Sequence, residues 1–263
     1  MRVIAGPEKK TRVMSEKERL ITAYHEMGHA IVGHLLPNCD PVHKVSIISR
    51  GQALGYTISL PTEDKFLTTR AELADTMAMT LGGRAAEEIV FGEITTGASN
   101  DLEKVTQTAK QMVMRYGMSE KLGPRVFGHD STQPFLGRDM GSEPDYSDEI
   151  AREIDDEIRR VVEEAHQTAK DLLSDNRKGL EATSKILLDR ETIDATQFVA
   201  LLEGASEEEV FGAEDEGGDE VSEDSEEEAE AEKGTGREGP RPSPSARPGF
   251  AAEMRADERP QRD

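Results

Sequence analysis

The chain has 263 residues, of which 35% are hydrophobic, and its formal net charge is −22. This length and apolar content suffice for one sizeable folded domain, and the strong negative charge argues against nucleic acid as a partner. The single cysteine, Cys39, excludes an internal disulfide framework and fits a reducing, cytoplasmic compartment. Because the sequence has no run of 18 or more apolar residues and no signal peptide, we expect a soluble chain.

The first predicted element is a helix that begins after Ser15 and ends before Pro37. Ser15 and Glu18 have the spacing of a capping box, in which each side chain accepts a hydrogen bond from the other residue's backbone. Gly28 is small enough to let another chain segment approach this helix closely. Apolar residues recur at helical intervals and predict one buried face: Leu20, Ile21, Tyr24, Met27, Ile31 and Leu35.

Within this helix, residues 25–29 read His-Glu-Met-Gly-His, a spacing typical of zinc peptidases. His25 and His29 lie on one helix face with Cβ atoms about 5–6 Å apart, so that both imidazoles can bind one ion. Glu26 would then lie beside a zinc-bound water and act as its general base. Paired histidines also occur on helix surfaces and in cores, but the capped amphipathic helix favours a metal site. His34 fits no ligand spacing.

A third metal ligand is needed, and the sequence leaves its identity open. The extended motif with a third histidine is excluded, because Val32 and Leu35 stand where Gly and His are required. Spacing alone does not choose among the remaining candidates, which are Asp64, Asp75, Glu87, Glu88, Asp101 and, as an outsider, His43.

Residues 42–49 and 54–60 are short β-branched and apolar runs, and they predict a strand pair or a sheet edge. An exposed edge can bind a substrate segment as an additional strand through backbone hydrogen bonds, with little regard to sequence. A purely structural hairpin is the alternative, and the pattern does not separate the two.

The next helices carry the candidate carboxylates. Glu87 and Glu88 follow two glycines in a second amphipathic helix, where they can also belong to a salt-bridged or solvated face. A turn-rich loop, residues 95–101, then leads into a third helix at Asp101. The simplest role for Asp101 is a carboxylate at the helix start that interacts with the helix dipole.

The C-terminal part of the folded region is predicted to be helical over residues 147–174, 176–188 and 192–202, where we assign only packing. After residue 204 the apolar periodicity ends. Residues 207–232 contain 15 acidic residues and no basic one, and a stretch rich in Pro, Arg, Gly and Ser follows. We therefore expect residues 204–263 to be a disordered acidic tail that keeps the chain soluble.

Together these residues resemble the peptidase domain of the FtsH family of membrane-associated, ATP-dependent zinc metalloproteases. The resemblance runs from about Arg2 to about Leu202. It rests on an ordered series of separated stretches: residues 25–30, 55–57, 81–88, 96–102, 117–119, 122–123, 135–137 and 191–193.

The resemblance implies a mainly α, zincin-like metallopeptidase domain with a small β-sheet over residues 15–203. It implies that His25, His29 and Asp101 bind one zinc ion per subunit and that Glu26 is the catalytic base. The expected function is that of a zinc-dependent metalloendopeptidase.

The resemblance also gives Glu87 a role beside the metal, where it orients a ligand, and it favours a substrate-binding edge strand at Gly55 and Tyr56. It implies unfolded proteins as substrates and a homohexamer as the assembled form. The alternative is a non-catalytic, zinc-stabilised fragment that assembles but is inactive without an ATPase ring.

Members of this family carry membrane segments and an ATPase module before the peptidase domain. Residues 1–14 resemble the end of that module, but no Gly-x-x-x-x-Gly-Lys-Ser/Thr phosphate loop and so no nucleotide site occurs in the chain. We therefore expect a cytoplasmic peptidase fragment, whose ATP dependence and contact with the plasma membrane would come through segments that the chain lacks.

Overall fold

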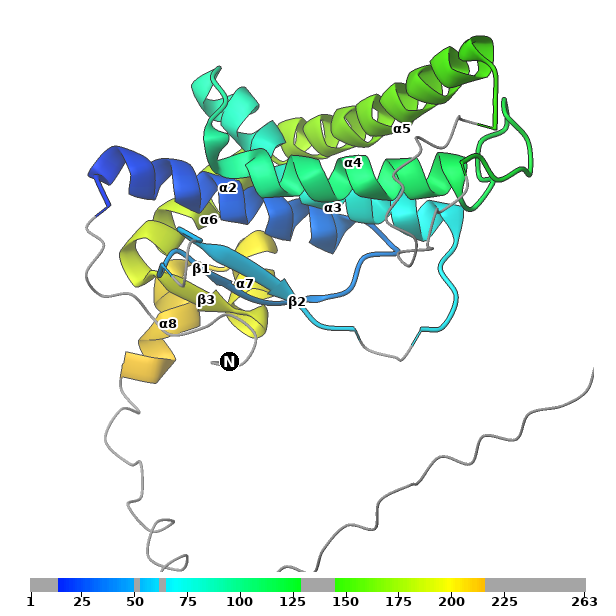
Figure 1. Ribbon diagram of the computed structural model, residues 1–263. Helices are drawn as coiled ribbons and strands as arrows, with labels where there is room; N and C mark the ends of the chain where they lie inside the picture. Colours follow the sequence, from blue (N-terminus) through cyan, green and yellow to red (C-terminus); the bar gives the residue numbers. More distant parts are fainter. Residues whose placement is uncertain (1–13, 50–52, 62–64, 129–144, 216–263) are drawn as a thin grey trace, which may run out of the picture. The chain divides into compact units, whose positions relative to one another are not determined.

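The computed structural model describes residues 14–49, 53–61, 65–128 and 145–215, all of which lie in the first of two units of the chain, residues 1–217 (Figure 1). The structure is mainly helical with one small antiparallel sheet, as the sequence predicts. The helices are α2 (Glu16–Leu35), α3 (Arg70–Phe91), η1 (Thr96–Ala98), α4 (Ser99–Met114), α5 (Asp148–Asp175), α6 (Arg177–Arg190), α7 (Ala195–Leu202) and α8 (Glu207–Asp215). The strands are β1 (Val42–Ser46), β2 (Tyr56–Ser59) and β3 (Thr192–Asp194).

Helix α2 has the predicted start and, except at Leu35, which is 37% exposed, the predicted buried face. The Ser15 hydroxyl accepts from the Glu18 backbone N–H at 3.2 Å, and the Glu18 carboxylate accepts from the Ser15 N–H at 2.9 Å. Ala23, Met27 and Ile31 on the inner face are fully buried. The capping box therefore fixes where the helix begins, and the apolar stripe fixes which side faces the core.

Helices α2 and α3 cross at two glycines. A Cβ built at Gly82 would lie only 2.6 Å from the backbone oxygen of Gly28, and a Cβ at Gly28 would meet the backbone oxygen of Gly82. The helix backbones thus approach more closely than any side chain at either position permits. This close crossing brings α3 directly beside the histidine face of α2.

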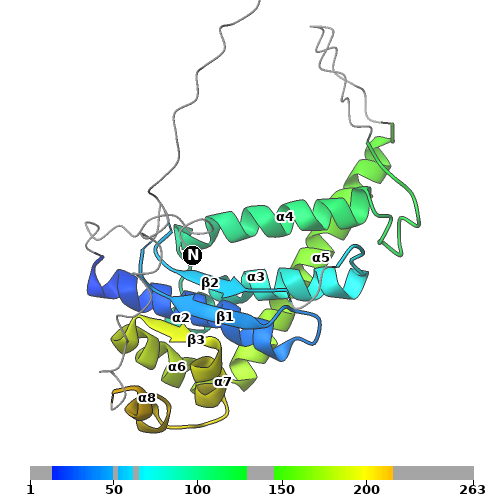
Figure 2. The same ribbon diagram turned by 90° about the horizontal axis from the view of Figure 1, so that it is seen from below.

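The three strands form an antiparallel sheet in the order β2-β1-β3, which lies against α2 (Figure 2). Val45 of β1 pairs with Thr57 of β2 on one side and with Ile193 of β3 on the other. The order leaves β2 at an edge of the sheet.

The helix predicted over residues 192–202 begins later in the structure than the sequence suggested. Residues Thr192–Asp194 form β3, and α7 begins only afterwards, because the Asp194 side chain accepts from the Gln197 N–H at 2.9 Å and caps the helix. Glu191 has a left-handed φ of 59°, which ends α6 and turns the chain into the strand. The strand was missed because its partner, β1, is distant in sequence.

The predicted start of the disordered tail, residue 204, is also wrong, because helical structure continues beyond it. Residues Glu207–Asp215 form α8, whose Phe211 is only 5% exposed and packs with its ring centroid 4.5 Å from the guanidinium carbon of Arg190. The expectations for residues 216–263 and 1–13 lie outside the described residues. Among the described helices, none combines the length and the apolar character needed to cross a membrane.

Candidate metal centre

Three potential metal ligands from two helices converge on one point between α2 and α4. His25 and His29 lie on α2, and Asp101 lies in the first turn of α4. Nε2 of His25 and Nε2 of His29 are 3.1 Å apart, and each lies 3.4 Å from Oδ2 of Asp101. Among the described residues, this is the one group of three or more such side chains that is arranged to hold a metal ion.

The second nitrogen of each histidine is held by an acceptor. Nδ1 of His25 lies 2.7 Å from Oε1 of Glu87, and Nδ1 of His29 lies 2.9 Å from the backbone oxygen of Met79. The Gly83 N–H is also 3.3 Å from Nδ1 of His29, but the shorter contact is with a carbonyl, which can only accept. Both Nδ1 atoms therefore carry protons. Each ring directs its Nε2 atom to the centre, and this atom offers a lone pair when the ring is neutral.

This arrangement fits a zinc ion. In a tetrahedral zinc site, ligand atoms about 2.0–2.2 Å from the metal lie about 3.3–3.6 Å from one another. The two observed separations of 3.4 Å fall within that range, and the third, 3.1 Å between the two Nε2 atoms, is about 0.2 Å shorter. Two imidazole lone pairs and a carboxylate oxygen repel one another at these distances unless a cation or a proton lies between them, so the donor set suits a bound metal.

The electrostatics of the centre point the same way. Burial lowers the pKa of His25, but hydrogen bonds to Asp101 and Glu87 outweigh it and raise the pKa to about 9. Burial raises the pKa of Asp101, but its bonds to His25 and His29 prevail and hold it well below its usual range. The negative charge of the surroundings thus attracts a cation, which is a proton when no metal is bound.

Glu87 supports the histidine and does not join the ligand triangle. Its side chain is 1% exposed, and its two oxygens have separate partners: Oε1 contacts His25, while Oε2 accepts from the Thr95 N–H at 2.7 Å. Burial raises its pKa, but these two bonds prevail and lower it, so the carboxylate is ionised. This is the geometry of a carboxylate that orients a metal-binding histidine.

The segment before α4 places Asp101. The Thr95 hydroxyl accepts from the Gly97 N–H at 3.1 Å and starts η1, which runs directly into α4. Asp101 lies in the first turn of α4, as expected from the sequence, and its Oδ1 lies 3.2 Å from Nζ of Lys104. One oxygen of the carboxylate therefore pairs with Lys104, while the other faces the two histidines.

Glu26 lies beside the histidines, and its residue is 8% exposed. Burial raises the pKa of its carboxyl group, although the neighbouring histidines partly offset this effect. Its Oε2 accepts a hydrogen bond from the Thr57 hydroxyl at 2.8 Å. A carboxylate with a raised pKa is a stronger base, which suits proton abstraction from water near neutral pH.

The other candidate ligands lie away from the triangle. Asp75 accepts from the side chain of Asn38 at 2.8 Å, and Glu88 forms ion pairs with Arg84 and Lys170. His43 is exposed on β1. Asp64 lies outside the described residues.

Sequence reasoning missed four groups that shape the centre: the Met79 carbonyl, Gly83, the Thr95 N–H and the Thr57 hydroxyl. A Cβ at Gly83 would lie 2.6 Å from Nε2 of both His25 and His29, so this position must be glycine for the rings to converge. Backbone groups carry no signal in the side-chain pattern. Only the position of Thr57, directly after Gly55 and Tyr56 in the predicted edge strand, offered a clue.

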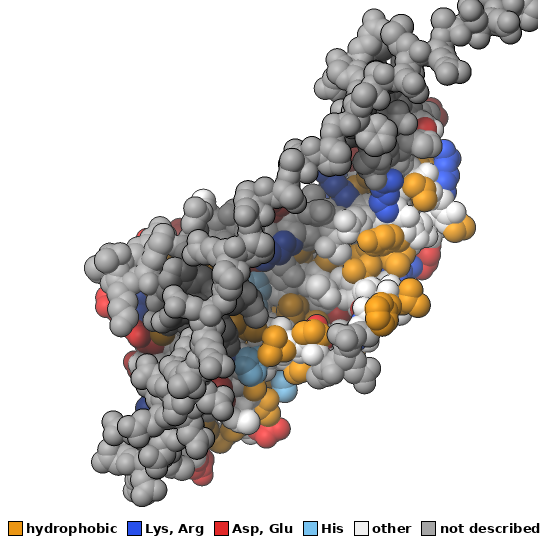
Figure 3. Space-filling view, turned by 60° about the horizontal axis from the view of Figure 1, so that its bottom comes forward, with side chains coloured by type: hydrophobic (Ala, Val, Ile, Leu, Met, Phe, Trp, Pro, Cys, Tyr) orange, Lys and Arg blue, Asp and Glu red, His pale blue; other side chains and the backbone are white. Residues whose placement is uncertain are grey.

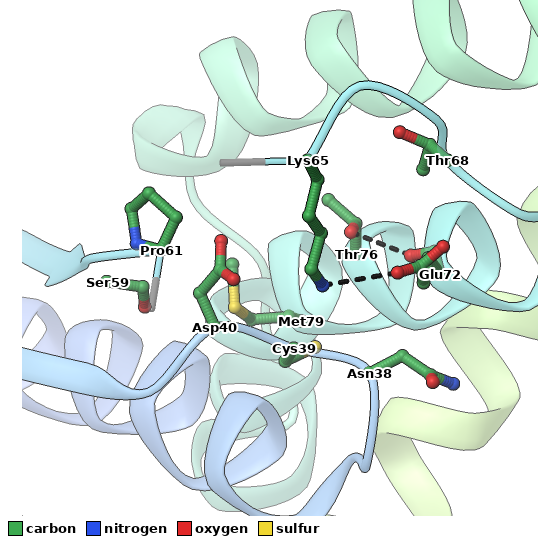
Figure 4. Close-up of a pocket in the computed structure, with 10 residues that line it drawn as sticks. All are labelled: Asn38, Cys39, Asp40, Ser59, Pro61, Lys65, Thr68, Glu72, Thr76 and Met79. Carbon is green, nitrogen blue, oxygen red and sulfur yellow. Dashed lines mark hydrogen bonds and ion pairs between the residues drawn. The ribbon is translucent and has the colours of Figure 1, made fainter. Parts of the chain in front are cut away.

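A pocket of about 430 Å³ lies beyond the C-terminal end of β2, between the residues after α2 and the first half of α3 (Figure 4). In it, Nζ of Lys65 lies 3.1 Å from Oε1 of Glu72. Cys39 also lines the pocket, and burial together with nearby carboxylates raises the pKa of its thiol to about 12. The thiol is therefore protonated at neutral pH and is a poor nucleophile.

The face shown in Figure 3 exposes histidine side chains with hydrophobic side chains beside them. The most exposed large hydrophobic residues of the described chain are Phe66, at 95%, and Leu67, at 87%. Both lie in the segment between β2 and α3. They place two neighbouring apolar side chains in solvent within this segment.

Comparison with known proteins identifies the family of this chain. A family model described as peptidase family M41 matches residues 12–201. ATP-dependent zinc metalloprotease FtsH 1 of Conexibacter woesei is 70% identical over 264 residues, which cover 99% of this chain and 39% of that protein. FtsH proteins of Rubrobacter xylanophilus and Bacillus subtilis are 62% and 51% identical over 202 and 221 residues, which cover 77% and 84% of this chain.

The chain spans between 31% and 39% of the length of these three relatives. The family model, in contrast, covers most of the described residues, including both histidines, Glu26 and Asp101. The resemblance to FtsH-type peptidase domains is thereby confirmed, and the chain belongs to peptidase family M41.

Proposed function

We propose that this chain is a zinc-dependent metalloendopeptidase that hydrolyses peptide bonds of unfolded proteins. The observation that carries the proposal is the convergence of Nε2 of His25, Nε2 of His29 and Oδ2 of Asp101 within 3.4 Å of one another, beside the buried Glu26. The names of the relatives, all zinc metalloproteases, support the same metal.

In this proposal His25, His29 and Asp101 hold the ion, and Glu87 keeps the His25 ring in the orientation and tautomer that direct Nε2 inward. Zinc, when bound, polarises the scissile carbonyl and lowers the pKa of water to about 7. Glu26 takes the proton of the attacking water and then delivers it to the leaving amine nitrogen. Because burial raises the pKa of Glu26, its carboxyl group can serve in both directions.

The substrate backbone is proposed to pair with the edge strand at Gly55, directly before β2, and at Tyr56, its first residue. Support comes from the position of β2 at the edge of the sheet and from the approach of Gly55 to Glu26. A segment bound as an additional strand is held by backbone hydrogen bonds, so that an extended chain of almost any sequence fits. Phe66 and Leu67, exposed in the segment that follows this strand in the chain, offer apolar side chains that suit apolar segments of unfolded proteins.

We further propose that folded substrates require ATP-driven delivery and that the active form is a homohexamer in the cytoplasm. Support for delivery comes from the relatives' names, which include ATP dependence, and from the fraction of their length that this chain spans. The chain itself contains no Gly-x-x-x-x-Gly-Lys-Ser/Thr phosphate loop.

The test is cleavage of a fluorescently labelled, permanently unfolded protein by the purified chain with zinc and without ATP. Glu26→Gln should abolish cleavage and keep stoichiometric zinc, while Glu103→Gln, an exposed carboxylate change on α4, should leave activity intact. Chelation should abolish activity and zinc should restore it. A stably folded protein should resist cleavage. Stoichiometric zinc without turnover would instead support the non-catalytic assembly fragment.

A further inference from the structure

Strand β2 and the residue directly before it, Gly55, both reach the proposed catalytic base. A Cβ at Gly55 would lie 2.8 Å from Cγ and from Oε1 of Glu26, so only a glycine lets the chain pass this close. Two residues later, the Thr57 hydroxyl lies 2.8 Å from Oε2 of Glu26 and 3.0 Å from the Glu26 backbone oxygen. The edge strand and the base are therefore in direct contact.

The Thr57 hydroxyl has one proton, and two acceptors compete for it. The carboxylate is the stronger acceptor because it is charged and closer, and the Glu26 carbonyl lies inside α2, where it already accepts a helix hydrogen bond. The proton is therefore donated to Oε2. Among the described residues, no hydrogen-bond donor contacts Oε1 of Glu26, so this oxygen is left for the water.

We propose that Thr57 is a positioning residue, whose hydroxyl fixes the Glu26 carboxylate so that Oε1 faces the water that attacks the substrate. This inference rests on the proposed function. Because Thr57 belongs to the strand proposed to bind the substrate backbone, pairing of the substrate with β2 also holds the residue that orients the base. Substrate binding and base orientation are thus coupled through one strand.

The test replaces Thr57 with valine, which keeps the shape of the side chain and removes its hydroxyl. Thr57→Val should lower kcat for the unfolded substrate by about 10- to 100-fold, the usual effect of losing a hydrogen bond to a charged group, with little change in KM. Thr57→Ser restores the hydroxyl and should recover most of kcat. Thr106→Val, at an exposed threonine of α4, is the matched control and should match the wild type.

A second measurement does not depend on turnover. Acetohydroxamate chelates zinc, and its hydroxyl proton needs a correctly placed carboxylate as acceptor. Calorimetric titration of zinc-loaded protein should show about 10-fold weaker binding to Thr57→Val than to wild type or Thr57→Ser, at equal zinc content.

The outcomes separate the two proposals. A wild type that cleaves nothing, or an active Glu26→Gln variant, would refute the proposed function, while the hydroxamate titration would still decide the role of Thr57. If Glu26→Gln is inactive but Thr57→Val has wild-type kcat and hydroxamate affinity, the positioning role is overturned. A fall in kcat that Thr57→Ser does not recover would also overturn it, because the effect would then come from packing.

Discussion

Gly83 is the position at which a single methyl group should disable the metal centre. An added Cβ there would lie 2.6 Å from Nε2 of His25 and from Nε2 of His29, whereas ordinary contact begins near 3.4 Å. Each ring would have to retreat by roughly 0.8 Å. The two rings cannot both do so and still converge with Asp101 on one ion. Gly83→Ala should therefore weaken zinc binding although no metal ligand is replaced.

The expected magnitude has two parts. In the helix interior, alanine is favoured over glycine by about 0.8–1.0 kcal/mol, so the metal-free protein should keep its stability once the rings rotate away. Groups that orient metal ligands typically contribute 10- to 100-fold in affinity. A 100-fold loss removes about 2.7 kcal/mol of zinc-linked stabilisation at saturating metal, or roughly 5–11 °C in Tm for a domain of this size.

The assay compares thermal unfolding with zinc and with a chelator, together with zinc affinity from competition with a chromophoric chelator. Gly83→Ala should lose roughly 5–11 °C of the zinc-induced rise in Tm and differ little from wild type in chelator. Gly212→Ala, where an added Cβ on α8 meets nothing within 4 Å, is the matched control. Wild-type zinc affinity in Gly83→Ala would refute the geometry of the centre described above.

Three further results are expected. Glu87→Gln removes the charge that faces Nδ1 of His25 and should weaken zinc binding by about 10- to 100-fold with the fold intact, as dialysis against graded zinc would show. Because the pKa of His25 is raised to about 9, its proton stabilises the metal-free fold below about pH 6.5, and this contribution is lost as the pH rises through 9. In chelator, Tm should therefore fall between pH 6.5 and 9, and a pH-independent Tm would contradict the assignment. Phe211→Ala should lower the free energy of unfolding by about 3–5 kcal/mol in urea titrations, since this residue packs α8 onto the domain beside Arg190; an unchanged midpoint would mean that α8 does not contribute to the fold.

The sequence by itself determined the local features of this protein. The start of α2, its buried face and the shared direction of His25 and His29 all depend on contacts within about one turn of helix, which the pattern of residues encodes directly. The long α5 was predicted for the same reason, because its apolar residues recur at helical spacing over the 28 residues of the helix. The two histidines on one helix face were therefore enough to predict a metal site from the sequence.

Only the tertiary structure decided which groups complete the site. The sequence does not distinguish the carboxylates of Asp101, Glu87 and Glu88 from one another. The packing of α4 directs Asp101 toward the Nε2 atoms of the two histidines. The glycine crossing of α2 and α3 brings Glu87 to Nδ1 of His25. Strand β3 depends in the same way on a partner distant in the chain. These contacts join residues far apart in sequence, so their geometry follows from packing and not from any local pattern.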